Sequence, residues 1–177
     1  MNDSLLIALS AELGALLVAR GWRVTAAESC TGGLVAGAIT ATAGSSSWFD
    51  VGYVTYADAA KREVLGVPAT MLEAFGAVSE PTAKAMAAGA LARSDADLAV
   101  AITGIAGPGG GSADKPVGTV WVAWAARSGA LVAECRCFAG DRAAIRYASV
   151  VSALEGLIEL SRQATSIQKP AGAIEDD

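Results

Sequence analysis

The sequence predicts an α/β fold, a three-layer α/β/α domain with a mixed sheet of about five strands. Short apolar runs of strand length alternate along the chain with segments that have helical periodicity. The run at 98–105 is almost continuously apolar, as in a central strand covered on both faces. The later runs 118–126 and 131–138 are separated by a four-residue turn, which is typical of an antiparallel hairpin. We therefore expect a sheet that is parallel at first and antiparallel at the hairpin edge.

The first part of the chain contains both helical periodicity and short runs of strand length. Leucines recur at helical spacing after the capping candidates Asp3 and Ser4, and Gly21 ends this first helix. Strands are expected where β-branched, aromatic and apolar residues form short runs. The further elements expected before residue 66 are strands at 23–28 and 50–56 and helices at 32–43 and 58–65.

Capping patterns locate two more helices. Thr70 and Glu73 stand at capping-box spacing, and Gly76 ends the short helix that they begin. Ser79 is the expected N-cap of the next helix, which runs to about Ala92 with a proline in its first turn.

The C-terminal part of the chain is expected to form one long helix followed by a tail. A long helix opens at 140–142 and ends at about residue 164. We expect residues 1–164 to form a single domain and the acidic segment 165–177 to be a disordered tail.

Composition excludes several classes of protein. With 177 residues, of which 53% are hydrophobic, the chain can bury a substantial core. A net charge of -5 with scattered basic residues argues against a nucleic-acid partner. The N-terminus lacks the positive start of a signal peptide, and the apolar runs are too short to span a bilayer. We therefore expect a cytoplasmic protein with no membrane partner.

The three cysteines also fit a reducing compartment, because a chain of this size does not need disulfide bonds. Cys135 and Cys137 would lie on one face of a strand. Two thiols without further ligands make a poor metal site, so we expect this pair to be packed in the protein.

The turn at 27–33 carries the first candidate for chemistry. Ser29 sits where a strand leads into a helix, in a chain that contains no histidine, so Ser-His-Asp and Cys-His catalysis are excluded. In one interpretation Ser29 or Thr31 only caps the helix. In the other, the helix N-terminus offers N–H groups to a phosphate or an oxyanion. Cys30 is a second candidate nucleophile, ranked below Ser29.

Other candidates also follow predicted strands. Lys61 is either a solvated surface lysine or a buried general base, a role that arginine cannot take because it keeps its charge. The glycine-rich segment 103–111 is neither a P-loop nor a dinucleotide fingerprint, and it is either a linker or a ligand-contacting loop. Arg142 is either a surface residue or an anion ligand. Ligands in such sheets bind at the carboxyl ends of strands, where Ser29, Tyr56 and this loop are expected.

Six motifs follow one another in order along the chain, at 27–33, 44–49, 54–56, 76–81, 104–108 and 115–120. This set resembles the CinA C-terminal domain family, whose stand-alone members are nicotinamide mononucleotide deamidases of the PncC type. The resemblance spans about residues 4–160. It implies a CinA C-terminal domain-like fold and hydrolysis of the carboxamide of nicotinamide mononucleotide to nicotinic acid mononucleotide and ammonia, a reaction of pyridine nucleotide salvage.

The resemblance also implies roles for individual residues. Ser29 would be the nucleophile, with Lys61 and Tyr56 as the activating and proton-shuttling pair, and no cofactor or metal is called for. We further expect substrate contacts from the Ser29 turn, the glycine-rich loop and the long helix, namely Cys30, Thr31, Gly32, Gly33, Thr103, Gly104, Gly107 and Arg142. The small residues on the helices suggest a homodimer. The competing hypothesis is a non-catalytic nucleotide-binding or competence-associated interaction module.

Overall fold

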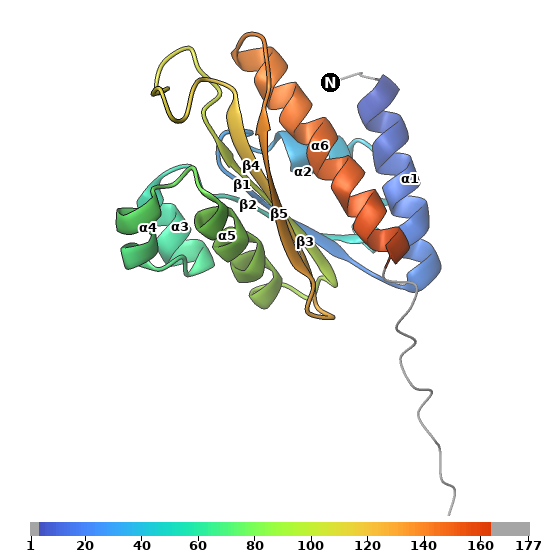
Figure 1. Cartoon of the computed structure of the whole chain (residues 1–177). Coiled ribbons are helices and arrows are strands. Elements are labelled where there is room, and N and C mark those ends of the chain that lie inside the picture. The colour runs from blue at the N-terminus through green and yellow to red at the C-terminus, as the bar shows by residue number, and fades with distance from the viewer. Residues whose placement is uncertain (1–3, 164–177) are drawn as a thin grey trace, which may run out of the picture.

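The computed structural model describes residues 4–163 and has the predicted three-layer architecture (Figure 1). The helices are α1 (Ser4–Arg20), α2 (Leu34–Thr40), α3 (Asp58–Leu65), α4 (Ala69–Phe75), α5 (Glu80–Ala92) and α6 (Arg142–Gln163), with a short 3-10 helix η1 (Ser45–Ser47). The strands are β1 (Val24–Glu28), β2 (Phe49–Val54), β3 (Leu98–Gly104), β4 (Thr119–Ala126) and β5 (Leu131–Cys137). The predicted tail at 165–177 lies outside the described residues.

The five strands form one sheet in the order β2-β1-β3-β4-β5. β1 pairs in parallel with both β2 and β3, whereas β3–β4 and β4–β5 are antiparallel. The predicted mixed sheet with a hairpin at one edge is therefore confirmed. β1 is completely buried and β3 is buried except at its last residue, as expected for the centre of a covered sheet.

The two faces of the sheet carry separate cores. α1, α2 and α6 cover one face, where large side chains such as Leu13, Trp124 and Leu154 are buried. α3, α4 and α5 lie on the other side, where the buried residues are mostly alanines with Leu65 and Met86. The small side chains allow a close approach there. An added Cβ on Gly89 of α5 would stand 2.1 Å from the carbonyl oxygen of Leu65.

Two predicted helix starts were wrong. α2 begins at Leu34 rather than at residue 32, because Gly32 and Gly33 both have positive φ and form a turn before the helix. α4 begins at Ala69 after Pro68, so Thr70 lies inside the helix and the expected capping box does not form. By contrast, the Ser79 side chain accepts a hydrogen bond from the Thr82 N–H, as a predicted N-cap should.

Two further findings concern surfaces. Cys135 and Cys137 lie on β5 and are both exposed, so the prediction that they are packed was wrong. The reason is that β5 is the edge strand of the sheet, with a neighbouring strand on one side only, and most of its residues are exposed.

Within residues 4–163, no helix combines the length and apolar character that a membrane span requires.

Candidate active site

The carboxyl ends of three strands bring the predicted site residues to one edge of the sheet. β1, β2 and β3 are parallel neighbours, and Glu28 at the end of β1 is in register with Val54 and Ile102. The Ser29 N–H donates to the Ile102 carbonyl at 2.9 Å, and the Glu28 carbonyl accepts from the Thr55 N–H at 2.8 Å. The expectation that Ser29, Tyr56 and the loop after Thr103 share one edge is therefore confirmed.

Glu28 is the residue at this edge that sequence reasoning missed. Its side chain is completely buried, and its carboxylate oxygens accept from the N–H groups of Gly33, Val35 and Ala36 at 2.9–3.1 Å. α2 has no conventional side-chain cap of its own. The last residue of β1 therefore satisfies the helix N-terminus from across the turn, and in doing so it fixes the backbone on both sides of Ser29.

This contact changes which N–H groups a ligand can reach. The N–H groups of the α2 start already have an acceptor in Glu28, and the Gly32 N–H donates to the Ser29 carbonyl at 3.1 Å. An external anion is therefore not needed to satisfy this helix. Among the described residues, the N–H groups of Cys30 and Thr31 donate neither to Glu28 nor to a backbone carbonyl, although the Cys30 N–H interacts with its own thiol. The Thr31 hydroxyl is buried without a partner among the described residues, and it does not cap α2.

Lys61 is buried rather than solvated. Its side chain is only 1% exposed, and its Nζ donates to the Tyr56 carbonyl oxygen at 3.0 Å and lies 3.5 Å from Oδ1 of Asp58. Burial lowers the pKa of the Lys61 amine below its ordinary value, and Asp58 partly opposes this effect. The Tyr56 carbonyl that accepts from Lys61 follows Thr55, whose N–H donates to the carbonyl of Glu28 just before Ser29, so Lys61 lies near the Ser29 turn.

Tyr56 faces solvent and makes a different contact from the one expected. The side chain is 57% exposed, and its hydroxyl accepts from Nη2 of Arg142 at 2.9 Å. The contact between Tyr56 and Lys61 runs through the Tyr56 carbonyl oxygen instead. Arg142 also donates from Nη1 to the Gly107 carbonyl at 2.8 Å, so it joins the end of β2 to the glycine-rich loop.

A second arginine of α6 contacts the Ser29 turn. Nη2 of Arg146 donates to the Thr31 carbonyl at 2.8 Å, and its buried Nε has no partner among the described residues. Arg146 stands four residues after Arg142, so the two guanidinium groups project from one face of the helix toward the site. That spacing is a signal in the sequence that could have identified Arg146.

Cys30 is poorly suited to act as the nucleophile. Its side chain is 5% exposed, and burial raises the pKa of the thiol to about 11, although its own backbone N–H and Arg146 act in the opposite direction. The thiol therefore stays protonated at neutral pH. This finding supports the ranking of Ser29, which is 8% exposed, above Cys30.

The loops around the edge are tied down by side-chain to backbone hydrogen bonds. The Thr103 hydroxyl donates to the Ala77 carbonyl at 2.8 Å, and Lys115 donates to the carbonyls of Phe75 and Val78 at 3.2 and 2.8 Å. Gly104 has no room for a side chain, because an added Cβ would lie 2.9 Å from the Thr119 carbonyl oxygen. The segment after β3 is thus held against the start of α5.

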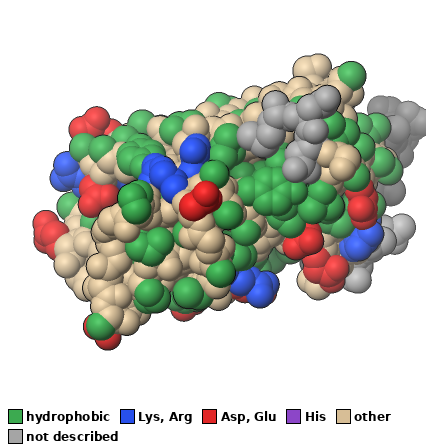
Figure 2. Space-filling model, turned by 90° about the horizontal axis from the view of Figure 1, so that it is seen from above, with side chains coloured by type: hydrophobic (Ala, Val, Ile, Leu, Met, Phe, Trp, Pro, Cys, Tyr) green, Lys and Arg blue, Asp and Glu red, His purple; other side chains and the backbone are tan. Residues whose placement is uncertain are grey.

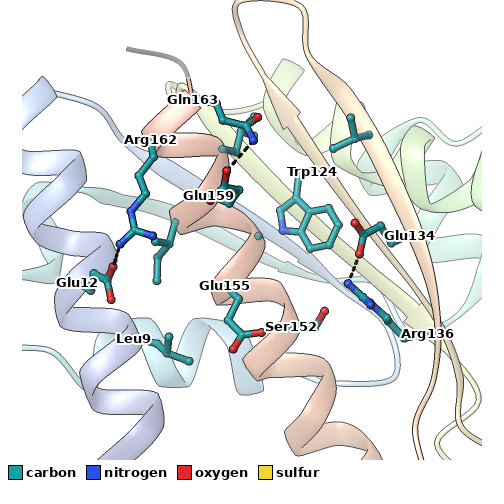
Figure 3. A pocket seen from close by; sticks show the side chains of 14 residues that line it. Leu9, Glu12, Trp124, Glu134, Arg136, Ser152, Glu155, Glu159, Arg162 and Gln163 are labelled. Carbon is teal, nitrogen blue, oxygen red and sulfur yellow. Dashed lines mark hydrogen bonds and ion pairs between the residues drawn. The ribbon is translucent and has the colours of Figure 1, made fainter.

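Figure 2 looks onto this edge from above and shows scattered Lys and Arg side chains, with Asp and Glu side chains among them, on a surface of hydrophobic and neutral atoms. A hollow of about 680 Å³ lies elsewhere, between α6 and β5, and none of the predicted site residues lines it (Figure 3). A smaller apolar hollow of about 400 Å³ is lined by Leu34 and Arg146 and borders the Ser29 turn. We take the strand ends, where the chemistry gathers, as the candidate site.

The sequence is similar to known proteins over most of its length. Residues 6–161 match the family described as CinA C-terminal domain. The chain is 54% identical over 155 residues to nicotinamide-nucleotide amidohydrolase PncC of Enterobacter agglomerans, covering 88% of this chain and 94% of that protein. A CinA-like protein of Akkermansia muciniphila is 55% identical over 141 residues, which are 80% of this chain but 34% of that longer protein.

A solved structure has the same fold. The crystal structure of the competence/damage inducible protein CihA from Agrobacterium tumefaciens superposes with a TM-score of 0.89 at 50% sequence identity, covering 90% of this chain and 98% of that one. The three-layer arrangement predicted from the sequence is thus shared with a relative whose structure is known.

Proposed function

This chain belongs to the CinA C-terminal domain family, and on that premise we propose that it is an amidohydrolase that converts nicotinamide mononucleotide to nicotinic acid mononucleotide and ammonia. The observation that carries the proposal is the Lys61 amine, which is buried beside the Ser29 turn with its pKa lowered. In a chain without histidine, such an amine can serve as the base that a serine nucleophile needs.

In the proposed reaction, Ser29 Oγ attacks the carboxamide carbon while its proton passes to neutral Lys61, directly or through Tyr56. The tetrahedral intermediate collapses by breaking the C–N bond, and the leaving amine takes up the proton to depart as ammonia. Water then attacks the resulting ester, with the same base accepting the proton, and releases the carboxylic acid and free Ser29. The atoms balance with one water consumed for each ammonia released.

We assign the oxyanion to the N–H groups of Cys30 and Thr31, since Glu28 and the Ser29 carbonyl occupy the N–H groups that follow. Gly104 and Gly107 would let the loop backbone approach the substrate from the other side. Arg142 remains our proposed ligand for the substrate phosphate, and Arg146 joins it because both residues come from α6 and donate to groups at this edge of the sheet. Together these residues would hold the nucleotide at both ends.

The wider setting forms part of the same proposal. We propose that the reaction serves pyridine nucleotide salvage in the cytoplasm, that the chain forms a homodimer, and that it has no nucleic-acid or membrane partner. The net charge of -5 supports the last point, because a phosphate backbone requires clustered positive charge.

The test is ammonia release from nicotinamide mononucleotide, measured for the wild type and for Ser29→Ala, with product identified as nicotinic acid mononucleotide. We expect kcat of the variant to fall by more than about 10³-fold, because loss of the nucleophile costs at least as much as loss of an oxyanion donor. Saturable binding without ammonia release by the wild type would instead identify a non-catalytic binding module. Free nicotinamide and the dinucleotide serve as comparison substrates, and a preference for either would redirect the assignment to another amide.

A further inference from the structure

The edge strand β5 is the most exposed part of the sheet. Six of its seven residues are exposed, whereas seven of the eight residues of the adjacent strand β4 are buried. Leu131 and Val132 are 41% and 51% exposed although both are large and apolar. In Figure 1 this strand lies at the front of the sheet. A long edge strand of this kind pairs readily with another strand unless something blocks it.

The backbone of β5 offers a regular set of groups for such pairing. The Phe138 N–H donates to the Gly118 carbonyl, and at the other end the Ala130 carbonyl accepts from the Ala126 N–H. In an antiparallel ladder the bonded positions alternate, so even-numbered residues of β5 bond to β4. The odd-numbered residues, from Leu131 to Cys137, therefore direct their N–H and carbonyl groups away from the sheet.

Side chains select the register of a second β5 strand. Glu134 and Arg136 lie on the α6 side, where they form an ion pair and line the hollow shown in Figure 3. If Cys135 faces the partner's Cys135, each Glu134 lies directly opposite the partner's Arg136. Centring the pairing on Glu134 or on Arg136 would instead place like charges opposite one another, which is unfavourable. The charges therefore complement each other in one of these three registers.

We propose that two copies of this chain associate through antiparallel pairing of their β5 strands, with the twofold axis at Cys135. In this arrangement the odd-numbered residues pair with one another across the axis, and each such pair exchanges two backbone hydrogen bonds. The two sheets become one continuous sheet, and four charges meet on its α6 side. The proposal specifies the interface of the homodimer proposed above and does not depend on the amidase activity.

The first test measures molar mass by light scattering and sedimentation over a concentration series. We expect twice the chain mass of 17.7 kDa for the wild type. Glu134→Arg and Arg136→Glu, each alone, place like charges opposite one another and should raise the dimer dissociation constant by roughly tenfold or more. The double variant restores opposite charges and should restore the dimer. Circular dichroism of each variant checks that the fold is intact.

The second test uses the thiols to read the register. Oxidation by dissolved oxygen with a copper-phenanthroline catalyst should join Cys135 to the partner's Cys135, since Cα atoms of a bonded antiparallel pair lie about 5.5 Å apart, within disulfide range. Cys137→Ser should retain the cross-link and Cys135→Ser should lose it. A monomeric wild type, a dimer indifferent to both charge reversals, or a cross-link that survives Cys135→Ser would overturn the proposal.

Discussion

Glu28 and Lys61 are both buried charged side chains beside Ser29, yet their surroundings differ in kind. The Glu28 carboxylate accepts from three backbone N–H groups, so each of its oxygens has a partner inside the protein. Lys61 has one carbonyl at 3.0 Å and a carboxylate 3.5 Å away that is itself 59% exposed. Burial lowers the pKa of the Lys61 amine, and Asp58 opposes this effect only in part.

The contrast separates a structural charge from a reactive one. A carboxylate whose oxygens accept the N–H groups of a helix start contributes to the fold. A group that is desolvated and only partly compensated is poised to lose its proton, as a general base must. Substitutions at the two positions should therefore affect different measured quantities.

The largest effect is expected at Lys61. Lys61→Arg keeps the positive charge but removes the ability to become neutral, so ammonia release should fall by roughly 10² to 10⁴-fold. Lys84→Arg is the matched control, because Lys84 pairs with Glu80 on the surface of α5 and should tolerate the same change. Turnover by Lys61→Arg within a few fold of the wild type would show that no neutral amine is needed there.

The next effect is on stability. Glu28→Gln replaces one acceptor oxygen with an N–H₂ group that faces backbone donors, and we expect the free energy of unfolding to fall by about 3 kcal/mol. Ser79→Ala provides the comparison, since it removes a conventional cap and should cost only about 1 kcal/mol. Denaturant titration measures both. Equal losses in the two variants would mean that Glu28 is no more than an ordinary cap.

A smaller and more specific effect concerns the pH profile. Asp58 raises the pKa of Lys61 against the effect of burial, so Asp58→Asn should lower that pKa further. Activity requires the neutral amine and therefore rises with pH through the pKa of Lys61. The rise in kcat/KM should then occur at lower pH in the variant than in the wild type. Glu63→Gln, an exposed change on the same helix, should leave the profile in place, and an unmoved profile in Asp58→Asn would argue against Lys61 as the base.

The smallest effect is expected at Cys30. With the thiol protonated and buried, Cys30→Ala should keep kcat within about threefold of the wild type. In a Cys135→Ser, Cys137→Ser background, the single remaining thiol should react with a disulfide reagent much faster after unfolding than before. Loss of turnover in Cys30→Ala together with rapid labelling of the folded protein would transfer the nucleophile role to Cys30.

Local signals in the sequence predicted most of the fold. Ser79 is followed directly by Glu80 and Pro81, a short pattern that predicts the N-cap of α5, and the turn between two apolar runs predicts the hairpin. The start of α2 was missed because Glu28 belongs to a strand and reaches the helix across a turn at Gly32 and Gly33. A cap that comes from a different element leaves no periodic pattern to read.

The candidate site also combines features that local sequence signals predict with features that depend on contacts between distant elements. The parallel order of β1, β2 and β3 explains why Ser29, Tyr56 and the loop after Thr103 lie at one edge of the sheet. For Lys61, the residue type alone allows both a solvated surface lysine and a buried general base. The burial of Lys61 and the contact of Tyr56 with Arg142 depend on tertiary packing, which single-sequence patterns do not contain. For the same reason the exposure of Cys135 and Cys137 could not be read from their spacing.

The most direct test of the contrast is Lys61→Met, with ammonia release and the free energy of unfolding measured on the same preparation. Replacing an incompletely compensated buried charge by an apolar side chain of similar length should leave the free energy of unfolding unchanged or raise it, while ammonia release falls by at least about 10²-fold. A variant that unfolds much more readily yet turns over substrate normally while folded would contradict this account, because Lys61 would then be the structural charge.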